Sequence, residues 1–156
     1  MNSIALTVLI LQVAVIACID FRRFVIPDAC NAALAASGIC VSILTGRFDP
    51  ATLVISICLF GGLFTAIRQI HAQMTSRIGL GMGDVKMAAA AGCWISASDL
   101  PFFLGISSVA GLVYVAARLA AERRTPERIP FGPFLGFGLV TLFVFDAGQL
   151  QANFLR

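Results

Sequence analysis

Apolar residues along this chain form six runs, and short polar turns separate one run from the next. Charged side chains are concentrated in the turns and are rare within the runs. A helix that crosses a bilayer needs about 20 mostly apolar residues, and the longer runs approach that length. The pattern therefore predicts an all-α polytopic membrane protein, a bundle of about six transmembrane helices. The predicted spans are residues 4–19, 29–44, 51–67, 84–95, 101–119 and a last one from near 129 to before 149.

The composition favours a membrane protein over a soluble one. Hydrophobic residues make up 59% of the chain and charged residues 12%, with a mean hydropathy of +0.94, whereas soluble domains carry about 25% charged residues. We therefore expect one transmembrane domain over residues 1–156 and no separate soluble domain. The first run has no basic segment before it and no small-residue cleavage site, so we interpret it as a span and not as a signal peptide.

The sequence predicts neither a metal site nor a cofactor. The five cysteines lie within or beside apolar runs without C-x-x-C spacing, a pattern that indicates small packing residues and not a zinc site or a disulfide framework. His71, the single histidine, lies in a polar connection, where a solvated side chain is expected. Trp94 ends the fourth run, where we expect an aromatic residue of the membrane interface. The cysteines are Cys18, Cys30, Cys40, Cys58 and Cys93.

Basic residues lie mainly in the turns after the first, third and fifth spans. With six spans these turns share one side of the membrane, and the positive-inside rule places that side in the cytoplasm. Only Arg47 and Arg156 fall on the other side. Because six spans place both termini opposite the cytoplasmic turns, both termini are predicted outside. The net charge of +3 is interpreted as topology and not as nucleic-acid binding. The basic residues on the predicted cytoplasmic side are Arg22, Arg23, Arg68, Arg77, Lys86, Arg118, Arg123, Arg124 and Arg128.

The stretch of residues 78–86 alternates glycine with other residues and places Asp84 at the start of the fourth run. Gly79, Gly81 and Gly83 allow a tight turn and a close approach to another backbone or to a substrate. A carboxylate is favoured at a helix N-terminus, so one interpretation is a helix cap. An ionisable group at the edge of a membrane span is costly, which favours a functional role for Asp84.

A second carboxylate, Asp20, occupies a comparable place at the end of the first span. The link that follows contains Pro27, which restrains Ile26 to an extended conformation, and Asp28, which we expect to cap the next helix. The last span begins with a segment rich in proline and glycine, which favours a bent start over a regular helix. Its prolines and glycines are Pro130, Gly132, Pro133 and Gly136.

Two aspartates at similar membrane depth can share a proton, because neighbouring like charges raise one of the two pKa values. One of them then acts as general base on a water and the other as general acid, which is the chemistry of aspartic proteases. Alternatively, Asp20 and Asp84 form interfacial ion pairs with Arg22, Arg23 or Lys86. The spacing alone leaves both interpretations open.

Three motifs, in order, resemble those of the bacterial type IV prepilin peptidases, a family of membrane aspartic proteases with a G-x-G-D motif. Asp20 with residues 26–28 resembles the first motif, residues 81–86 the second, and residues 130–135 the proline-rich segment near the end. The resemblance covers nearly the whole chain and implies that Asp20 and Asp84 are the catalytic pair. The supporting motif residues are Gly81, Gly83, Lys86, Pro27, Asp28, Pro130, Gly132 and Pro133.

The same resemblance implies a substrate and a location. The substrate is a pilin precursor, cut just after a short basic leader at the cytoplasmic face of the bacterial inner membrane. Longer members carry a further cytoplasmic region associated with N-methylation, to which we expect no counterpart here, so the chain is closer to the short, peptidase-only forms of tight-adherence (Flp-type) pilus systems. Acidic residues are expected to attract the basic leader, namely Asp28, Glu122 and Glu127.

Other classes of protein also place carboxylates in membrane helices. A small transporter is expected to carry its site near the bilayer midplane at a repeat interface, whereas both aspartates lie at span ends and no internal repeat is evident. A presenilin-like protease pairs a similar glycine motif with Tyr-Asp, whereas Tyr114 is not followed by aspartate. A non-enzymatic assembly component of a pilus or secretion apparatus remains an alternative and would tolerate loss of either carboxylate.

Overall fold

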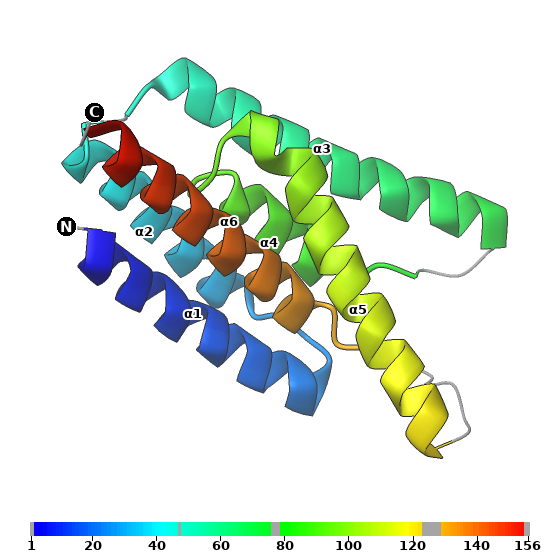
Figure 1. Ribbon diagram of the computed structural model, residues 1–156. Coiled ribbons are helices and arrows are strands. Elements are labelled where there is room, and N and C mark those ends of the chain that lie inside the picture. Colours follow the sequence, from blue (N-terminus) through cyan, green and yellow to red (C-terminus); the bar gives the residue numbers. More distant parts are fainter. Residues whose placement is uncertain (1, 47, 76–78, 123–128, 155–156) are drawn as a thin grey trace.

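The computed structural model describes residues 2–46, 48–75, 79–122 and 129–154, and within these ranges all regular structure is helical (Figure 1). These described residues form six α-helices and one short 3-10 helix, which confirms the prediction of an all-α fold. The helices are α1 (Asn2–Arg23), α2 (Asp28–Leu44), α3 (Pro50–Thr75), α4 (Met82–Ala91), η1 (Ala97–Asp99), α5 (Leu100–Glu122) and α6 (Gly132–Phe154).

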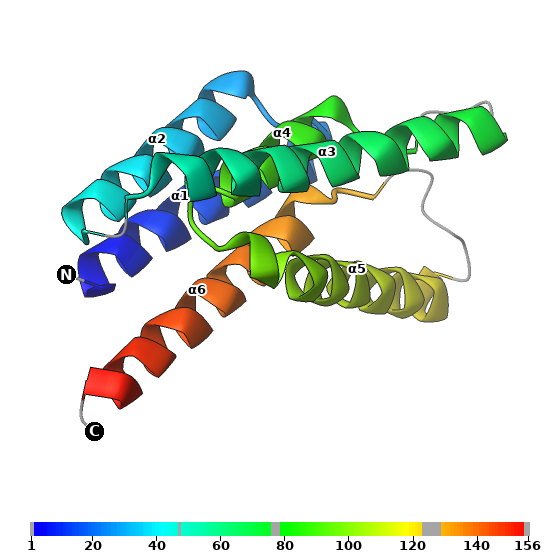
Figure 2. The ribbon, with the colours of Figure 1, turned by 90° about the horizontal axis from the view of Figure 1, so that it is seen from above.

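Successive passes of the chain run in alternating directions, so the N- and C-termini lie at the same end of the bundle (Figures 1 and 2). The C-terminal ends of α1, α3 and α5 and the beginnings of α2, α4 and α6 lie away from the termini, as six passes require. Arg22 and Arg23 lie there, in the last turn of α1. Of the residues used for the topology prediction, Arg47, Arg77, Arg123, Arg124, Arg128 and Arg156 lie outside the described residues.

Three helical segments are long and apolar enough to cross a bilayer: Ser3–Arg23, Pro50–Thr75 and Ala97–Ala121. Only 22%, 17% and 17% of their most apolar windows are buried inside the bundle. Because the other apolar side chains face outward, lipid and not water is the favourable surrounding. Asp28–Leu44 and Gly132–Asp146 are shorter apolar helices. These features support a multi-pass membrane protein.

The core forms around α4 and α6. α4 packs against α2, α3 and α6, and α6 packs against α1, α4 and α5. The rings of Phe60 and Phe64 on α3 meet Phe103 on α5, with ring centroids 5.3 and 6.0 Å apart. Trp94, just after α4, donates its indole N–H to the carbonyl of Leu34 at 2.8 Å. The aromatic contacts join α3 to α5, and the indole hydrogen bond holds the turn after α4 against α2.

Four helices extend beyond the C-terminal ends of the apolar runs that predicted them. α1 continues to Arg23, α3 to Thr75, α5 to Glu122 and α6 to Phe154. The prediction of a polar connection over residues 68–83 is therefore wrong for residues 68–75, which are helical. Helical hydrogen bonds lie within the backbone, so a helix with polar side chains can continue past the hydrocarbon region.

α4 is shorter than the predicted span 84–95. It has 10 residues, which corresponds to a rise of about 15 Å, half of the roughly 30 Å hydrocarbon core. Gly92 follows it and lies against the backbone of Ser56, where a Cβ atom would be 2.9 Å from the Ser56 carbonyl oxygen. The prediction of an interfacial Trp94 is wrong, because its side chain is 8% exposed and its N–H is satisfied inside the bundle.

The link between α1 and α2 differs from the prediction at one residue. α1 ends where Phe24 adopts a left-handed conformation with φ 53°, and its N–H donates to the carbonyl of Asp20 at 2.8 Å. Pro27, with φ −62° and ψ 140°, is the N-cap of α2. The prediction that Asp28 caps α2 is wrong, because Asp28 is already helical and its carboxylate pairs with Lys86 instead.

Candidate active site

Asp20 lies close to the C-terminal end of α1 and is 4% exposed. Its Oδ2 accepts a hydrogen bond from the backbone N–H of Gly132, the first residue of α6, at 2.9 Å. The N-terminus of a helix carries partial positive charge and free N–H groups, so it favours a carboxylate. A Cβ atom on Gly132 would be 2.9 Å from this same Oδ2. Glycine at the start of α6 thus allows the carboxylate to approach the backbone.

Asp84 lies in the first turn of α4 and is half-buried. Its Oδ2 accepts a hydrogen bond from the N–H of Gly81, the N-cap residue, at 3.1 Å. The helix-cap interpretation of Asp84, one of the two considered from the sequence, thus has a hydrogen bond in the structure. This bond engages one carboxylate oxygen and leaves the other for further interactions.

Ile26, in the link between α1 and α2, lies between the segments that hold the two aspartates. A Cβ atom on Gly132 would be 3.0 Å from Ile26 Cδ1, and a Cβ atom on Gly83 would be 3.1 Å from Ile26 Cβ. Gly132 donates a hydrogen bond to Asp20 and Gly83 precedes Asp84, so the buried Ile26 side chain lies next to the glycine neighbour of each aspartate. The carboxyl groups of Asp20 and Asp84 are close enough to interact electrostatically. The structure thus brings the two predicted carboxylates together.

The ion-pair interpretation finds a different partner for Lys86. Its Nζ lies 2.7 Å from Oδ1 of Asp28, and the two side chains are 43% and 74% exposed. Among the described residues, neither Asp20 nor Asp84 forms an ion pair. The Lys86–Asp28 contact joins the start of α2 to α4 on the outside of the site. Lys86 therefore partly neutralises the charge of Asp28, one of the acidic residues predicted to attract a basic leader. The other two cannot be placed, because Glu127 and the side chain of Glu122 lie outside the described residues.

The remaining motif residues lie around the two carboxylates. Gly81 and Pro27 are the N-cap residues of α4 and α2. Pro130 is buried just before α6, and Pro133 lies in the first turn of that helix, a position that proline tolerates because no N–H is needed there. The three motifs of the sequence thus meet at one end of the bundle.

Asn31 belongs to the site although the sequence reasoning did not single it out. Its side chain is 5% exposed, and its Nδ2 donates to the carbonyl of Gly83 at 3.2 Å. A signal existed, because an amide within an apolar predicted span has to find a polar partner. The sequence could not show that the partner is the residue before Asp84, 52 positions away.

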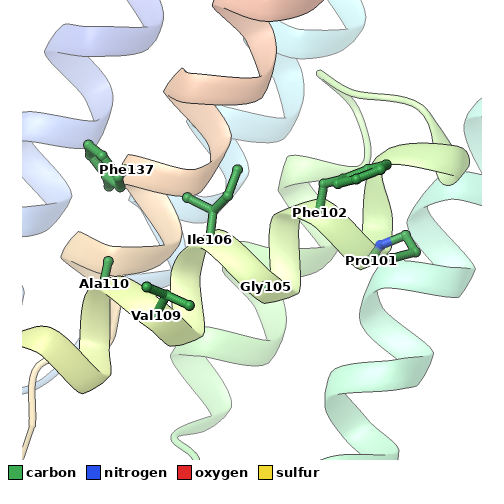
Figure 3. A pocket seen from close by; sticks show the side chains of 7 residues that line it. All are labelled: Pro101, Phe102, Gly105, Ile106, Val109, Ala110 and Phe137. Carbon is green, nitrogen blue, oxygen red and sulfur yellow. The ribbon is translucent and has the colours of Figure 1, made fainter.

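Two further features lie outside this site. The described residues contain no group of three or more His, Cys, Asp or Glu side chains that could hold a metal ion. An apolar groove of about 420 Å³ lies on the outer face of α5 and α6 (Figure 3). Neither aspartate lines it, so we do not assign it to the site. Its lining residues are Pro101, Phe102, Gly105, Ile106, Val109, Ala110 and Phe137.

The fold and the site define a class: a multi-pass membrane protein that holds two carboxylates from different helices at one end of its bundle. Residues 7–116 match the model of the type IV leader peptidase family. The chain belongs to this family. The matched range includes Asp20, Asn31 and Asp84, whereas the segment at the start of α6 lies beyond it.

Curated relatives carry names consistent with the family. The prepilin leader peptidase/N-methyltransferase of Escherichia coli strain K12 is 32% identical over 120 residues, which cover 77% of this chain and 53% of the relative. Leader peptidase HopD of Escherichia coli is 30% identical over 118 residues, 74% of this chain and 76% of the relative. The type 4 prepilin-like proteins leader peptide-processing enzyme of Escherichia coli O78:H11 is 31% identical over 146 residues, 90% of this chain and 52% of the relative.

The chain spans about half the length of the K12 and O78:H11 relatives. No solved structure matches it.

Proposed function

We propose that this protein is a membrane aspartic endopeptidase that removes the short basic leader from type IV prepilins of the Flp type. The observation that carries the proposal is that Asp20, on α1, and Asp84, on α4, are close enough to interact, with Ile26 packed against both Gly132 and Gly83. Family membership and the leader-peptidase names of the relatives support the same reaction. The proposal covers peptide-bond cleavage and not methyl transfer.

The two aspartates divide the proton transfers of hydrolysis between them. The ionised carboxylate takes a proton from a water whose oxygen attacks the carbonyl carbon of the scissile peptide bond. The protonated carboxylate supplies the proton that the nitrogen of the new amine needs when the C–N bond breaks. Two neighbouring carboxylates suit this division, because their repulsion favours a state in which they hold one proton between them. The N–H groups of Gly132 and Gly81 fix the orientation of each carboxylate.

The proposed location is the bacterial inner membrane, with the site at the cytoplasmic face and both termini outside. Support comes from the basic residues near the site end of the bundle, which the positive-inside rule places in the cytoplasm. We expect a reporter fused after Arg124 to show a cytoplasmic location and one fused at Arg156 to show an outside location. Reversed signals would contradict this orientation.

Co-expression with a Flp-type prepilin tests the proposed reaction. Cleavage shortens the prepilin by its leader, so we expect a smaller product whose new N-terminus is identified by mass spectrometry. The matched control is Asp84→Asn, brought to the same membrane level. A non-enzymatic assembly component would leave the size of the prepilin unchanged in both samples.

A further inference from the structure

Asn31 is a buried polar side chain for which the proposed proton transfers give no role. It lies near the start of α2, and its Nδ2 donates to the Gly83 carbonyl on α4 at 3.2 Å. Its Oδ1 is buried and has no hydrogen-bond partner. The amide therefore joins two helices through one of its two polar ends.

The energetics of this amide argue against a role in stability alone. A buried polar atom without a partner costs as much as or more than a typical hydrogen bond contributes net. An apolar side chain of similar shape at position 31 would avoid the unpartnered oxygen. The hydrogen bond to Gly83 is the interaction that such a side chain would lose.

The bond reaches the peptide that joins Gly83 to Asp84. At the same place the backbone of the link before α2 is close, because a Cβ atom on Gly83 would be 3.3 Å from the carbonyl oxygen of Ile26. α2 follows α1, which carries Asp20, after the short link of residues 24–27. The start of α2 is thus tied by the chain to one aspartate and by Asn31 to the other.

We propose that Asn31 is a positioning residue, which holds the Gly83–Asp84 peptide at a fixed place relative to Asp20. The inference rests on the proposed function for its kinetic consequence, and the anchoring itself can be measured without catalysis. The exposed Lys86–Asp28 pair joins the same two helices but is open to water, so it holds them less firmly than a buried bond.

The test replaces Asn31 by leucine, which has similar volume and removes both polar atoms. We expect kcat for prepilin cleavage to fall about 10- to 100-fold, because a displacement of about 1 Å can cost a hundredfold in rate. KM should stay within about twofold, because the leader and pilin helix do not need the amide to bind. Hydrogen exchange should become faster in residues 79–87 and stay unchanged in residues 132–146.

Ser37→Ala is the matched control. Ser37 lies on the same helix and joins α2 to α1 by a hydrogen bond between its Oγ and Oε1 of Gln12, at 2.9 Å. Its removal takes away an interhelical polar contact that does not reach the site, so kcat should be kept. If Asn31→Leu does not accumulate in the membrane, Asn31→Ser serves in its place, because its shorter side chain cannot span the distance to the Gly83 carbonyl.

The two measurements separate failure of this inference from failure of the proposed function. If the unsubstituted chain cleaves prepilin, a kcat kept within twofold, a raised KM with kcat kept, or unchanged exchange at residues 79–87 overturns the anchoring role. If the unsubstituted chain cleaves no prepilin, the proposed function fails, and hydrogen exchange alone then tests the anchoring role of Asn31. Faster exchange at residues 79–87 then supports the anchor, and unchanged exchange overturns it.

Discussion

The two aspartates are held by contacts of very different range. Asp20 accepts its hydrogen bond from Gly132, 112 positions later in the chain, so its orientation depends on the packing of α1 against α6. Asp84 accepts its bond from Gly81, three positions earlier, within the turn that starts α4. The first arrangement exists only in the assembled bundle, whereas the second can form locally. The distance between the carboxylates then depends on what connects the two regions.

That connection is made by the link of residues 24–27 and the start of α2. Ile26 packs against both glycine positions, Asn31 bonds the Gly83 carbonyl, and the Lys86–Asp28 pair adds an exposed contact. A local turn at Asp84 would be free to shift relative to Asp20 without these contacts. We therefore expect successively smaller effects on catalysis from substitutions at the two carboxylates, at Gly83 and Gly132, and at the exposed Lys86–Asp28 pair.

The largest effect is expected at the carboxylates themselves. Asp20→Asn and Asp84→Asn keep the shape but cannot exchange the proton, so each should lower kcat by about 10²- to 10⁴-fold. The double variant should cost little more than either single one, because groups that act as a unit are strongly non-additive. Prepilin cleavage and membrane level are measured together for all three. A well-expressed single variant that still processes prepilin at the normal rate would contradict the pair.

Gly83→Val should have the next largest effect. Its Cβ would meet the backbone N and O of Ile26 at 3.4 and 3.3 Å, atoms that cannot rotate away, so Asp84 has to move. We expect kcat to fall by about a hundredfold. The control is Gly62→Ala on α3, where a Cβ atom meets nothing within 4 Å. A normal rate for Gly83→Val would show that the turn before Asp84 needs no close approach to Ile26.

Gly132→Ala tests the long-range side of the comparison. The added methyl would lie 2.9 Å from Asp20 Oδ2 and 3.0 Å from Ile26 Cδ1, and both atoms are at the ends of side chains. Because these ends can adjust by rotation, we expect a smaller loss than for Gly83→Val, about tenfold in kcat. Steady-state kinetics at matched membrane levels gives the ratio of kcat between the unsubstituted protein and each variant. An effect larger than that of Gly83→Val would reverse the ranking.

The Lys86–Asp28 pair should matter less. Both side chains are well exposed, and pairs of this kind contribute at most about 1 kcal/mol. Lys86→Met, Asp28→Asn and the double variant form a cycle, which should give a coupling of less than about 1 kcal/mol in the free energy of unfolding. Their kcat values should stay within about threefold of the unsubstituted protein. A tenfold loss for Lys86→Met alone would show that Lys86 acts beyond this pair.

The smallest effect is expected at Asp49, before α3 and far from the site. Hydrogen bonds from the Thr52 hydroxyl and backbone N–H lower the pKa of its carboxyl below the ordinary value of 3.8. A lowered pKa stabilises the folded state above the ordinary pKa, and the contribution is lost as the pH falls through the lowered value. The amount by which the Tm of the unsubstituted protein exceeds that of Asp49→Asn should therefore decrease in acid. The kcat of Asp49→Asn should equal that of the unsubstituted protein. An advantage that grows in acid would contradict the sign.

Much of the candidate site was predictable from the sequence, because local sequence patterns indicate it. Alternating glycines before Asp84, a charge at the end of an apolar run and a proline-rich segment all mark the site without tertiary information. The 10-residue length of α4 was not predictable. The helix ends before Gly92, which packs closely against the backbone of Ser56 on α3, and this contact is not visible in the sequence. The role of Asn31 was hidden for the same reason. Contacts between residues 52 or 112 positions apart arise from packing.

The buried turn that follows α4 also bears on the supply of water for hydrolysis. Cys93, Trp94 and Ile95 lie in the turn after α4 and are buried. We expect this buried apolar turn to hinder solvent, so that water reaches the carboxylates from the basic end of the bundle. A membrane-impermeant thiol reagent should then modify an Asp84→Cys variant from the cytoplasmic side and leave Cys93 unmodified from either side. Modification of Cys93 from the outside would show a water path through the bundle.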